Sequence, residues 1–293
     1  MSKEMNLTFF SKLMLLVCSV PLCLSALSDT AQAQDRTFTE LTTGKLYVPD
    51  HLTPRDGKVD LIVHFHAGDR IGPDAVDDHR INAAVAIVHF GGFSSAYRVP
   101  FEEPDRFAEL LRDAEDQLQQ QPGFENTRLG RVNLVSFSAG YGAVREILKN
   151  PDYVAQIHGV LLTDSMYAAY TGDPALKQVN PPNVDPFVPF AKLAVAGDKT
   201  FVVTHTYLEP GGYAGTHECA AYLVKQLGLE TEAVPENEAI DPATGDLRLK
   251  ERAVVNGLHV LGYHGDTGED HGNHLRHTAD WLPLLPLEFL PKG

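Results

Sequence analysis

The stretch VNLVSFSAGYGAVREIL (residues 132–148) passes from an apolar segment into one with helical spacing, through small and polar residues. A loop that only connects two elements more often carries Asn, Asp or Pro. Here Ser138 stands at the centre of Ser-Phe-Ser-Ala-Gly, with Ser136 and Gly140 two positions to either side. Small residues at those positions suit a tight turn that pushes the central side chain outward. The stretch predicts an exposed serine between a strand and a helix, although a helix cap would also account for a serine here.

The segments around this turn alternate between strand-like and helix-like patterns. Near-continuous apolar runs, typical of strands buried on both faces, cover 59–68 and 82–92. Further strands are predicted over 131–137, 157–165, 199–208 and 256–265. Helices are predicted over 105–121, 140–150, 215–229 and 274–285. This alternation predicts an α/β domain with a mostly parallel sheet and helices on both faces.

Three other segments complete the predicted domain. Residues 36–50 have the pattern of one or two antiparallel strands at the edge of the sheet. Residues 166–190, with several Tyr and Pro, are expected to form a small lid beside the site. Residues 230–252 are acidic and polar, which favours a surface excursion over a separate domain.

The first 33 residues have the features of a secretory signal peptide. Lys3 and Lys12 precede a short apolar run at 13–24, and Ala-Gln-Ala at 31–33 resembles a cleavage site. We therefore predict cleavage after Ala33, a single domain over 34–293, and a secreted or periplasmic location. The apolar run is too short to span a bilayer comfortably, and no later stretch is long enough either, so no membrane insertion is expected.

Charge and cysteine content exclude several classes of partner and bond. The formal net charge of −15 argues against nucleic acid and anionic membranes as partners. Of the three cysteines, Cys18 and Cys23 lie in the predicted signal peptide. Cys219 is then left without a partner for an intramolecular disulfide. The oligomeric state stays open.

The Ser-Phe-Ser-Ala-Gly turn and the order of elements around it resemble the α/β-hydrolase fold, over nearly all of residues 34–293. The family pattern is Gly-x-Ser-x-Gly, and Ser136 here replaces the first glycine. The resemblance implies that Ser138 is a nucleophile. It also implies a histidine between the last strand and the last helix, and an acidic residue between serine and histidine in the sequence.

Four histidines occupy the implied position of the base: His264, His271, His274 and His277. We favour His274, because Asn273 would cap the last helix and hold the imidazole at its first turn. His271, on the preceding loop, is the second choice. For the acid we favour Asp164, which ends a predicted strand and preserves the order serine, acid, histidine. The more frequent family position follows the next strand, where Glu209 is the reserve; a turn cap is the alternative reading of Asp164.

The resemblance also implies backbone donors for the oxyanion of an acyl-transfer reaction. One is the N–H of Ala139, the residue after the nucleophile. The other is expected after the strand 59–65, from Ala67 or Gly68. Aromatic residues that could form the rim are Phe93, Tyr97, Tyr167 and Tyr170. This rim is compatible with a neutral or apolar acyl chain, or with a sugar ester.

These residues predict an exported serine hydrolase that cleaves an ester through a Ser138, His274, Asp164 triad, without a metal or other cofactor. Its partner would be a small-molecule or polymeric ester. A peptidase or amidase on the same triad is an alternative, as is a binding protein that has lost the chemistry. A metal site is a third alternative, because the histidines near the C-terminus lie close to Asp266 and Asp270. Three histidines spaced three residues apart, however, cannot all share one helical face.

Overall fold

The computed structural model describes residues 36–291, so the predicted signal peptide over residues 1–33 lies outside the described residues. Of the described residues, 37–291 form one compact unit. Within the described range, no helix is both long and apolar enough to cross a membrane.

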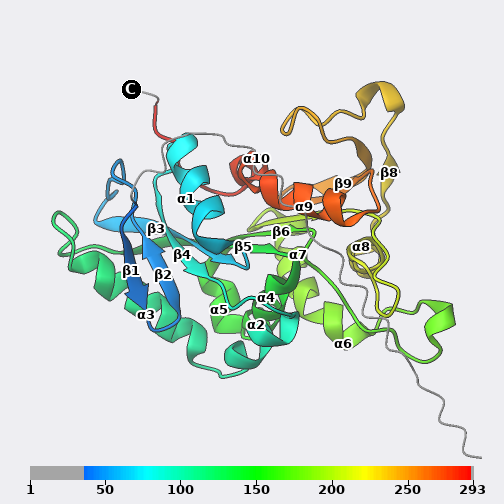
Figure 1. Cartoon of the computed structure of the whole chain (residues 1–293), viewed down its shortest axis with the longest axis horizontal. Coiled ribbons are helices and arrows are strands. Elements are labelled where there is room, and N and C mark those ends of the chain that lie inside the picture. Colours follow the sequence, from blue (N-terminus) through cyan, green and yellow to red (C-terminus); the bar gives the residue numbers. More distant parts are fainter. Residues whose placement is uncertain (1–35, 292–293) are drawn as a thin grey trace, which may run out of the picture. The chain divides into compact units, whose positions relative to one another are not determined.

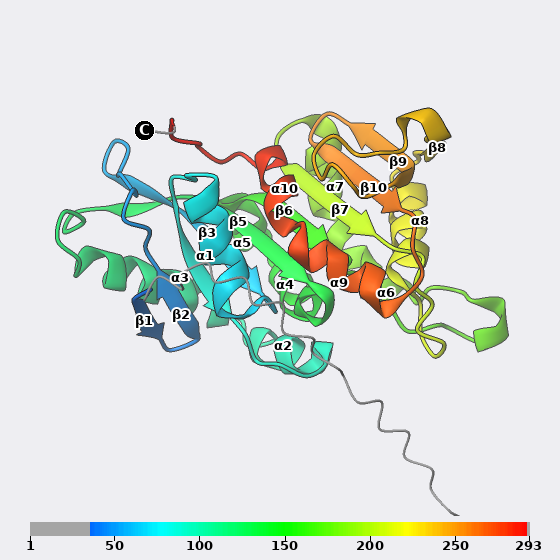
Figure 2. The same ribbon diagram turned by 45° about the horizontal axis from the view of Figure 1, so that its top comes forward.

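A single sheet organises this unit. Its strands are β1 (Phe38–Leu41), β2 (Gly44–Tyr47), β3 (Lys58–Phe65), β4 (Ala83–Val88), β5 (Arg128–Phe137), β6 (Ile157–Thr163), β7 (Thr200–His205), β8 (Glu232–Ala233), β9 (Leu249–Val255) and β10 (Leu258–Tyr263). They lie in the order β1-β2-β4-β3-β5-β6-β7-β10-β9-β8. The six central strands β4, β3, β5, β6, β7 and β10 are parallel to one another. Figure 2 shows β6, β7 and β10 side by side. The two strands at each end of the sheet are antiparallel to their neighbours.

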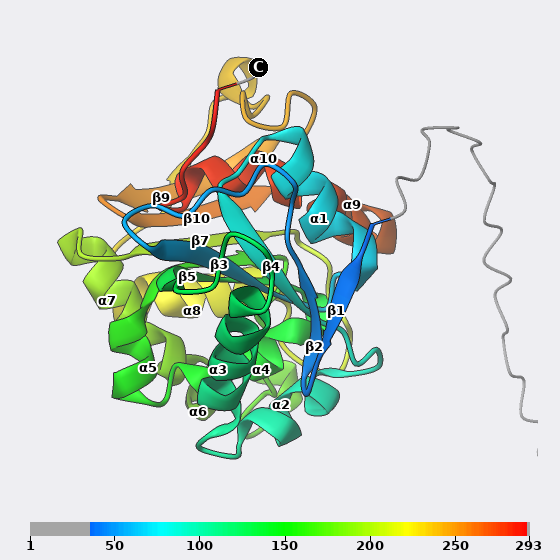
Figure 3. The ribbon, with the colours of Figure 1, turned by 90° about the vertical axis from the view of Figure 1, so that its left-hand side faces the viewer.

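Helices cover both faces of the sheet. They are α1 (Gly68–Asp78), α2 (Ser94–Phe101), α3 (Arg106–Gln119), α4 (Tyr141–Ile147), α5 (Pro151–Gln156), α6 (Pro181–Val184), α7 (Val188–Ala196), α8 (Thr216–Gln226), α9 (Gly268–Arg276) and α10 (Thr278–Trp281). Figure 3 shows α1, α9 and α10 on one face, and α3, α4, α5 and α8 on the other. The predicted α/β-hydrolase fold, with a mostly parallel sheet between two helical layers, is confirmed.

Two hydrophobic cores fill the spaces between the sheet and its helices. Phe201 and Val202, neighbours on β7, belong to opposite cores because side chains alternate across a strand. Phe107 of α3 packs in the first core, and Trp281 of α10 packs in the second. All six residues of β4 are buried. This explains why the central strands read as unbroken apolar runs.

The segment 230–252 differs from the prediction. It was expected to be a surface excursion, but part of it extends the sheet through β8 and β9 (Figure 1). β9 and β10 form a hairpin whose turn holds Asn256 at φ +49°. Asparagine followed by glycine is a strong hairpin signal, and Asn tolerates this left-handed conformation. The signal was present in the sequence as Asn256-Gly257.

Several helices, among them α1, α2, α5 and α7, had no counterpart among the predicted helices. α1 carries Pro73 within it, and α2 carries Pro100, and an internal proline obscures a helical pattern. The predicted edge strands over 36–50 are present as β1 and β2. The expected lid over 166–190 contains α6, and its first residues lie beside the serine described below.

Candidate active site

Ser138 lies on the predicted turn between β5 and α4. β5 ends at Phe137, a short 3₁₀ turn covers Ser138–Gly140, and α4 begins at Tyr141. The backbone of Ser138 has φ +48°, in the left-handed region that a non-glycine residue rarely adopts. A strained serine at the carboxyl end of a central parallel strand is the geometry of a nucleophile elbow.

Gly140 makes this turn possible. A Cβ atom at this position would lie 2.7 Å from the Ser136 hydroxyl oxygen and 2.8 Å from Phe65 Cβ and from its carbonyl oxygen. We therefore expect Gly140→Ala to destabilise the fold by about 2–4 kcal/mol. Urea unfolding at neutral pH measures this loss. Gly212→Ala is the matched control, since no atom lies near its added Cβ and its φ is not left-handed. Equal stability of the two variants would contradict the steric argument.

Ser136, which replaces the first glycine of the family pattern, takes part in a buried hydrogen-bond chain. Its hydroxyl lies 2.7 Å from the hydroxyl of Ser165, and Ser165 donates to the carbonyl oxygen of Ser138 at 2.8 Å. Since the Ser165 proton goes to that carbonyl, Ser136 is the donor to Ser165. The replacement thus ties the turn to the end of β6, where Ser165 follows Asp164.

His271 connects Ser138 to Asp164. Its Nε2 lies 2.9 Å from Ser138 Oγ, and its Nδ1 lies 2.6 Å from Asp164 Oδ2. The ring of Phe137 stacks on the imidazole with centroids 4.6 Å apart. Both ring nitrogens are therefore engaged and the ring plane is held. This is the arrangement in which a histidine can remove a proton from a serine while an acid holds its tautomer.

The preference for His274 as the partner of Ser138 is corrected to His271. His274 is buried, with Nδ1 2.7 Å from Thr204 Oγ1, and its ring packs against Tyr263 and Trp281. Burial lowers the pKa of its imidazole to about 4, so it is neutral at pH 7.

The error came from the predicted start of the last helix. α9 begins at Gly268, well before Asn273, and Thr267 and Asp270 cap it reciprocally. His271, rather than His274, therefore lies on its first turn. The Thr-Gly-Glu-Asp sequence of this capping box was readable as a helix start.

Asp164 follows β6 with φ +43° and is completely buried. Besides His271, its carboxylate accepts hydrogen bonds from Thr206 N at 3.0 Å, Thr206 Oγ1 at 2.8 Å and Thr216 Oγ1. Burial alone would raise the pKa of this carboxyl. The hydrogen bond from His271, the nearby histidines and Thr216 outweigh burial and hold the pKa well below its usual range. Asp164 is therefore an anion that faces Nδ1 of His271.

Other predicted residues lie away from this centre. Glu209, the reserve acid, pairs with Lys177 at 2.8 Å on the surface. Gly68 gives its N–H to His89 Nδ1 at 3.2 Å, and neither Ala67 nor Gly68 lines the cleft beside Ser138. The expectation of an oxyanion donor from this loop is thus corrected for Gly68, whose N–H is already engaged. Ala139 does line the cleft, next to Ser138.

The cleft beside Ser138 has a volume of about 660 Å³. Its lining residues come from three loops, from the turn at Ser138 with the start of α4, and from the first turn of α9: Gly92, Phe93, Ser94, Ser138, Ala139, Tyr141, Tyr167, Ala168, Ala169, Leu208, Pro210, Tyr213 and His271. Of the predicted aromatic rim, Phe93 and Tyr167 are in this set. The hydroxyl of Tyr97 instead lies 2.6 Å from His66 Nδ1, and the hydroxyl of Tyr170 donates a hydrogen bond to the carboxylate of Glu218. Tyr141 and Tyr213 were not anticipated.

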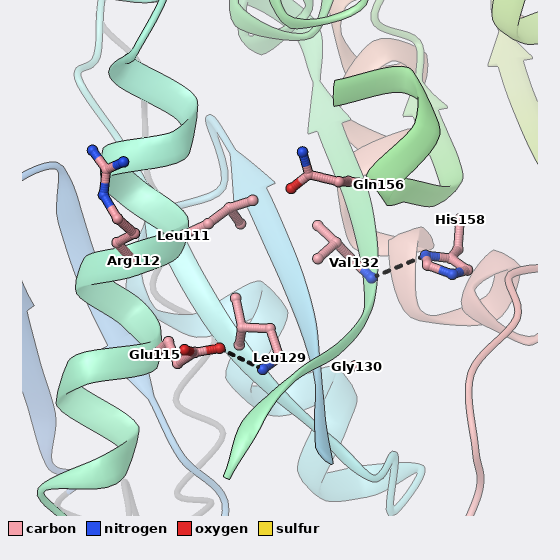
Figure 4. Close-up of a pocket in the computed structure, with 8 residues that line it drawn as sticks. All are labelled: Leu111, Arg112, Glu115, Leu129, Gly130, Val132, Gln156 and His158. Carbon is pink, nitrogen blue, oxygen red and sulfur yellow. Dashed lines mark hydrogen bonds between the residues drawn. The ribbon is translucent and has the colours of Figure 1, made fainter. Parts of the chain in front are cut away.

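A second hollow of about 350 Å³ lies at the opposite, amino ends of β5 and β6 (Figure 4). Its polar groups are largely engaged with the protein. Glu115 accepts from the N–H of Leu129 at 2.8 Å, and His158 Nδ1 faces the N–H of Val132 at 3.4 Å. None of the predicted site residues lines it. Ligands of open parallel sheets bind at the carboxyl ends, where Ser138 lies.

The predicted alternative of a metal site has no set of ligands in the described part of the chain. No group of three or more His, Cys, Asp or Glu side chains there could hold a metal ion. His271 uses both ring nitrogens within the protein, and His277 lies 2.7 Å from Asp280.

Buried histidines predict a loss of stability in mild acid. Burial lowers the pKa of His64 to about 3, and that of His205 and of His274 to about 4. Between pH 6.5 and about 4 the unfolded chain binds protons that the folded chain does not, so stability falls as the pH falls. We expect about 2 kcal/mol of loss per histidine from pH 7 to pH 5. Urea unfolding at both pH values measures it, and an unchanged free energy of unfolding would contradict the prediction.

No protein-family model matches the sequence, and no curated protein matches it. Solved structures do resemble the chain. An uncharacterised protein from Capnocytophaga ochracea has 9% identity and a TM-score of 0.46; the match covers 82% of this chain and 59% of that one. The feruloyl esterase module from Clostridium thermocellum has 11% identity and a TM-score of 0.43; the match covers 85% of this chain and 86% of that one. An esterase from Thermogutta terrifontis has 13% identity and a TM-score of 0.43; the match covers 88% of this chain and 97% of that one.

Proposed function

We propose that this protein is a serine hydrolase that cleaves ester bonds through an acyl-enzyme on Ser138. The observation that carries the proposal is the continuous hydrogen-bond path from Ser138 Oγ through His271 to Asp164. A serine hydroxyl attacks a carbonyl only when a base takes its proton, and the imidazole nitrogen Nε2 of His271, 2.9 Å away, is placed to do so. The order serine, acid, histidine along the chain is that of α/β hydrolases.

The steps follow from the positions of these groups. Ser138 Oγ bonds to the ester carbonyl carbon while its proton passes to His271 Nε2. Asp164 holds the Nδ1 proton and stabilises the imidazolium that forms. The backbone N–H of Ala139 is the proposed donor to the developing oxyanion. The proton on Nε2 then goes to the leaving alcohol, and water repeats the sequence to release the acid. An ester is the proposed substrate because an alcohol leaves more readily than an amine.

A fluorophosphonate probe tests this proposal directly, because only an activated serine reacts with it. We expect the purified protein to be labelled stoichiometrically, with the adduct located on the peptide that contains Ser138. Ser138→Ala is expected to abolish labelling, whereas Ser95→Ala, an exposed serine on α2, is expected to label as the wild type does. A folded wild-type protein that stays unlabelled would overturn the proposal and favour a binding protein.

We also propose that the protein is exported, on the strength of the N-terminal pattern that ends at Ala33. Expression of the full chain with N-terminal sequencing of the product tests this. A product outside the cytoplasm that begins at Gln34 is the expected result. An intact N-terminus in the cytoplasm would contradict it.

A further inference from the structure

We propose that the cleft beside Ser138 selects esters that carry an uncharged aromatic ring close to the scissile carbonyl. This inference rests on the proposed function and adds the substrate class to it. The ring can lie on the acid or on the alcohol side of the ester, and the experiment below separates these two sources.

Aromatic rings form a continuous series along the cleft, starting at the histidine. The ring of Tyr167 lies 6.4 Å from that of His271, centroid to centroid. Tyr141 lies 5.6 Å from Tyr167, and Tyr213 lies 5.8 Å from Tyr167 in an edge-to-face arrangement. All three tyrosines line the cleft. A substrate whose carbonyl reaches Ser138 therefore lies next to aromatic surfaces. A pair of aromatic rings contributes more interaction energy than burial of the same apolar area would.

Two rings that border this cleft are exposed to water. Phe93, which precedes α2, is 85% exposed, and Tyr213 is 47% exposed. When another apolar group covers a large apolar side chain that was exposed to water, the free energy of the system falls. Because both border the same cleft as Ser138, a bound ring can cover them while the ester reaches the serine. A volume of about 660 Å³ has room for a substituted ring.

The charges around the cleft disfavour an anionic substrate. No Lys, Arg, Asp or Glu is among the described residues that line it. A carboxylate on the substrate would thus lose water without gaining an ion pair, and the protein as a whole carries a net charge of −15. Glu209, adjacent to the lining residues Leu208 and Pro210, is occupied by Lys177. The cleft therefore favours rings without a negative substituent.

Matched ester pairs that differ only in the ring test this inference. On the acid side the pair is methyl 3-phenylpropanoate and methyl 3-cyclohexylpropanoate. On the alcohol side it is benzyl acetate and cyclohexylmethyl acetate. We expect the aromatic member of at least one pair to have a kcat/KM about two- to tenfold higher. The pair that shows the preference identifies the side on which the ring binds. A para-carboxylate on the ring is expected to lower kcat/KM by about tenfold or more.

Variants connect the preference to the rings. Tyr213→Leu and Phe93→Leu keep an apolar side chain, and at least one of them is expected to bring the aromatic-to-saturated ratio close to one. Phe289→Leu is the matched control, because Phe289 is 38% exposed but does not line the cleft. Its ratio is expected to equal that of the wild type. The inference would be overturned if the wild type hydrolysed saturated esters as well as aromatic ones, or if neither variant changed the aromatic-to-saturated ratio. In both cases, fluorophosphonate labelling of Ser138 would still support a serine hydrolase. Loss of labelling in the wild type would overturn both.

Discussion

Alanine at His271 is expected to lower kcat/KM for an activated ester by about 10⁴- to 10⁶-fold, with the fold intact. Nε2 of this imidazole is 2.9 Å from Ser138 Oγ, and Ala offers no other base at that place. Steady-state kinetics with a p-nitrophenyl ester, together with the rate of fluorophosphonate labelling, measures the effect. Labelling is expected to slow in parallel, because the probe needs the same activated oxygen.

His274 provides the decisive comparison for this prediction. His274→Asn keeps a polar atom near Thr204 and removes the imidazole, and its activity is expected to stay within about tenfold of the wild type. Its free energy of unfolding is expected to fall, since a buried ring between Tyr263 and Trp281 is lost. If His274→Asn were inactive and His271→Ala active, with both folded, the base would be His274 and the site as described would be wrong.

The second large effect is expected at Asp164. Asp164→Asn should reduce kcat by about 10⁴-fold, because an amide cannot stabilise the imidazolium and favours the wrong tautomer of His271. The depressed pKa of this carboxyl means that it is ionised at every pH near neutrality. Activity lost in mild acid is therefore expected to reflect protonation of other groups, and the variant should stay impaired across the whole pH range.

Glu209 is the control for the acid. Glu209→Gln removes only a surface ion pair with Lys177, so kcat is expected to stay within about twofold of the wild type. Asp164→Asn is also expected to cost about 1–3 kcal/mol of stability. Thr206 and Thr216 direct three hydrogen-bond donors at the two oxygens of this carboxylate. In the asparagine variant an NH₂ group replaces one oxygen, so at least one of these donors would lose its acceptor. An active Asp164→Asn with an inactive Glu209→Gln would reverse the assignment.

The sequence by itself determined the fold and the position of the serine. Unbroken apolar runs identify strands that are buried on both faces, and their alternation with amphipathic segments identifies a parallel sheet. Both signals are local, since each depends on residues a few positions apart. The same holds for the turn at Ser138, where small residues two positions to either side indicate a tight turn. Asp164 was found because its strand ends directly before it.

Only the tertiary structure decided which histidine faces the serine. His271 and His274 lie on the same short helix, so their roles depend on where that helix begins and how it is rotated against the sheet. The rotation is set by packing of His274 against Tyr263 and Trp281, which belong to β10 and α10. Likewise, Thr206 and Thr216 reach Asp164 from segments 42 and 52 residues away. Such contacts are made by the sheet, which brings distant chain segments to one edge, and no local pattern encodes them.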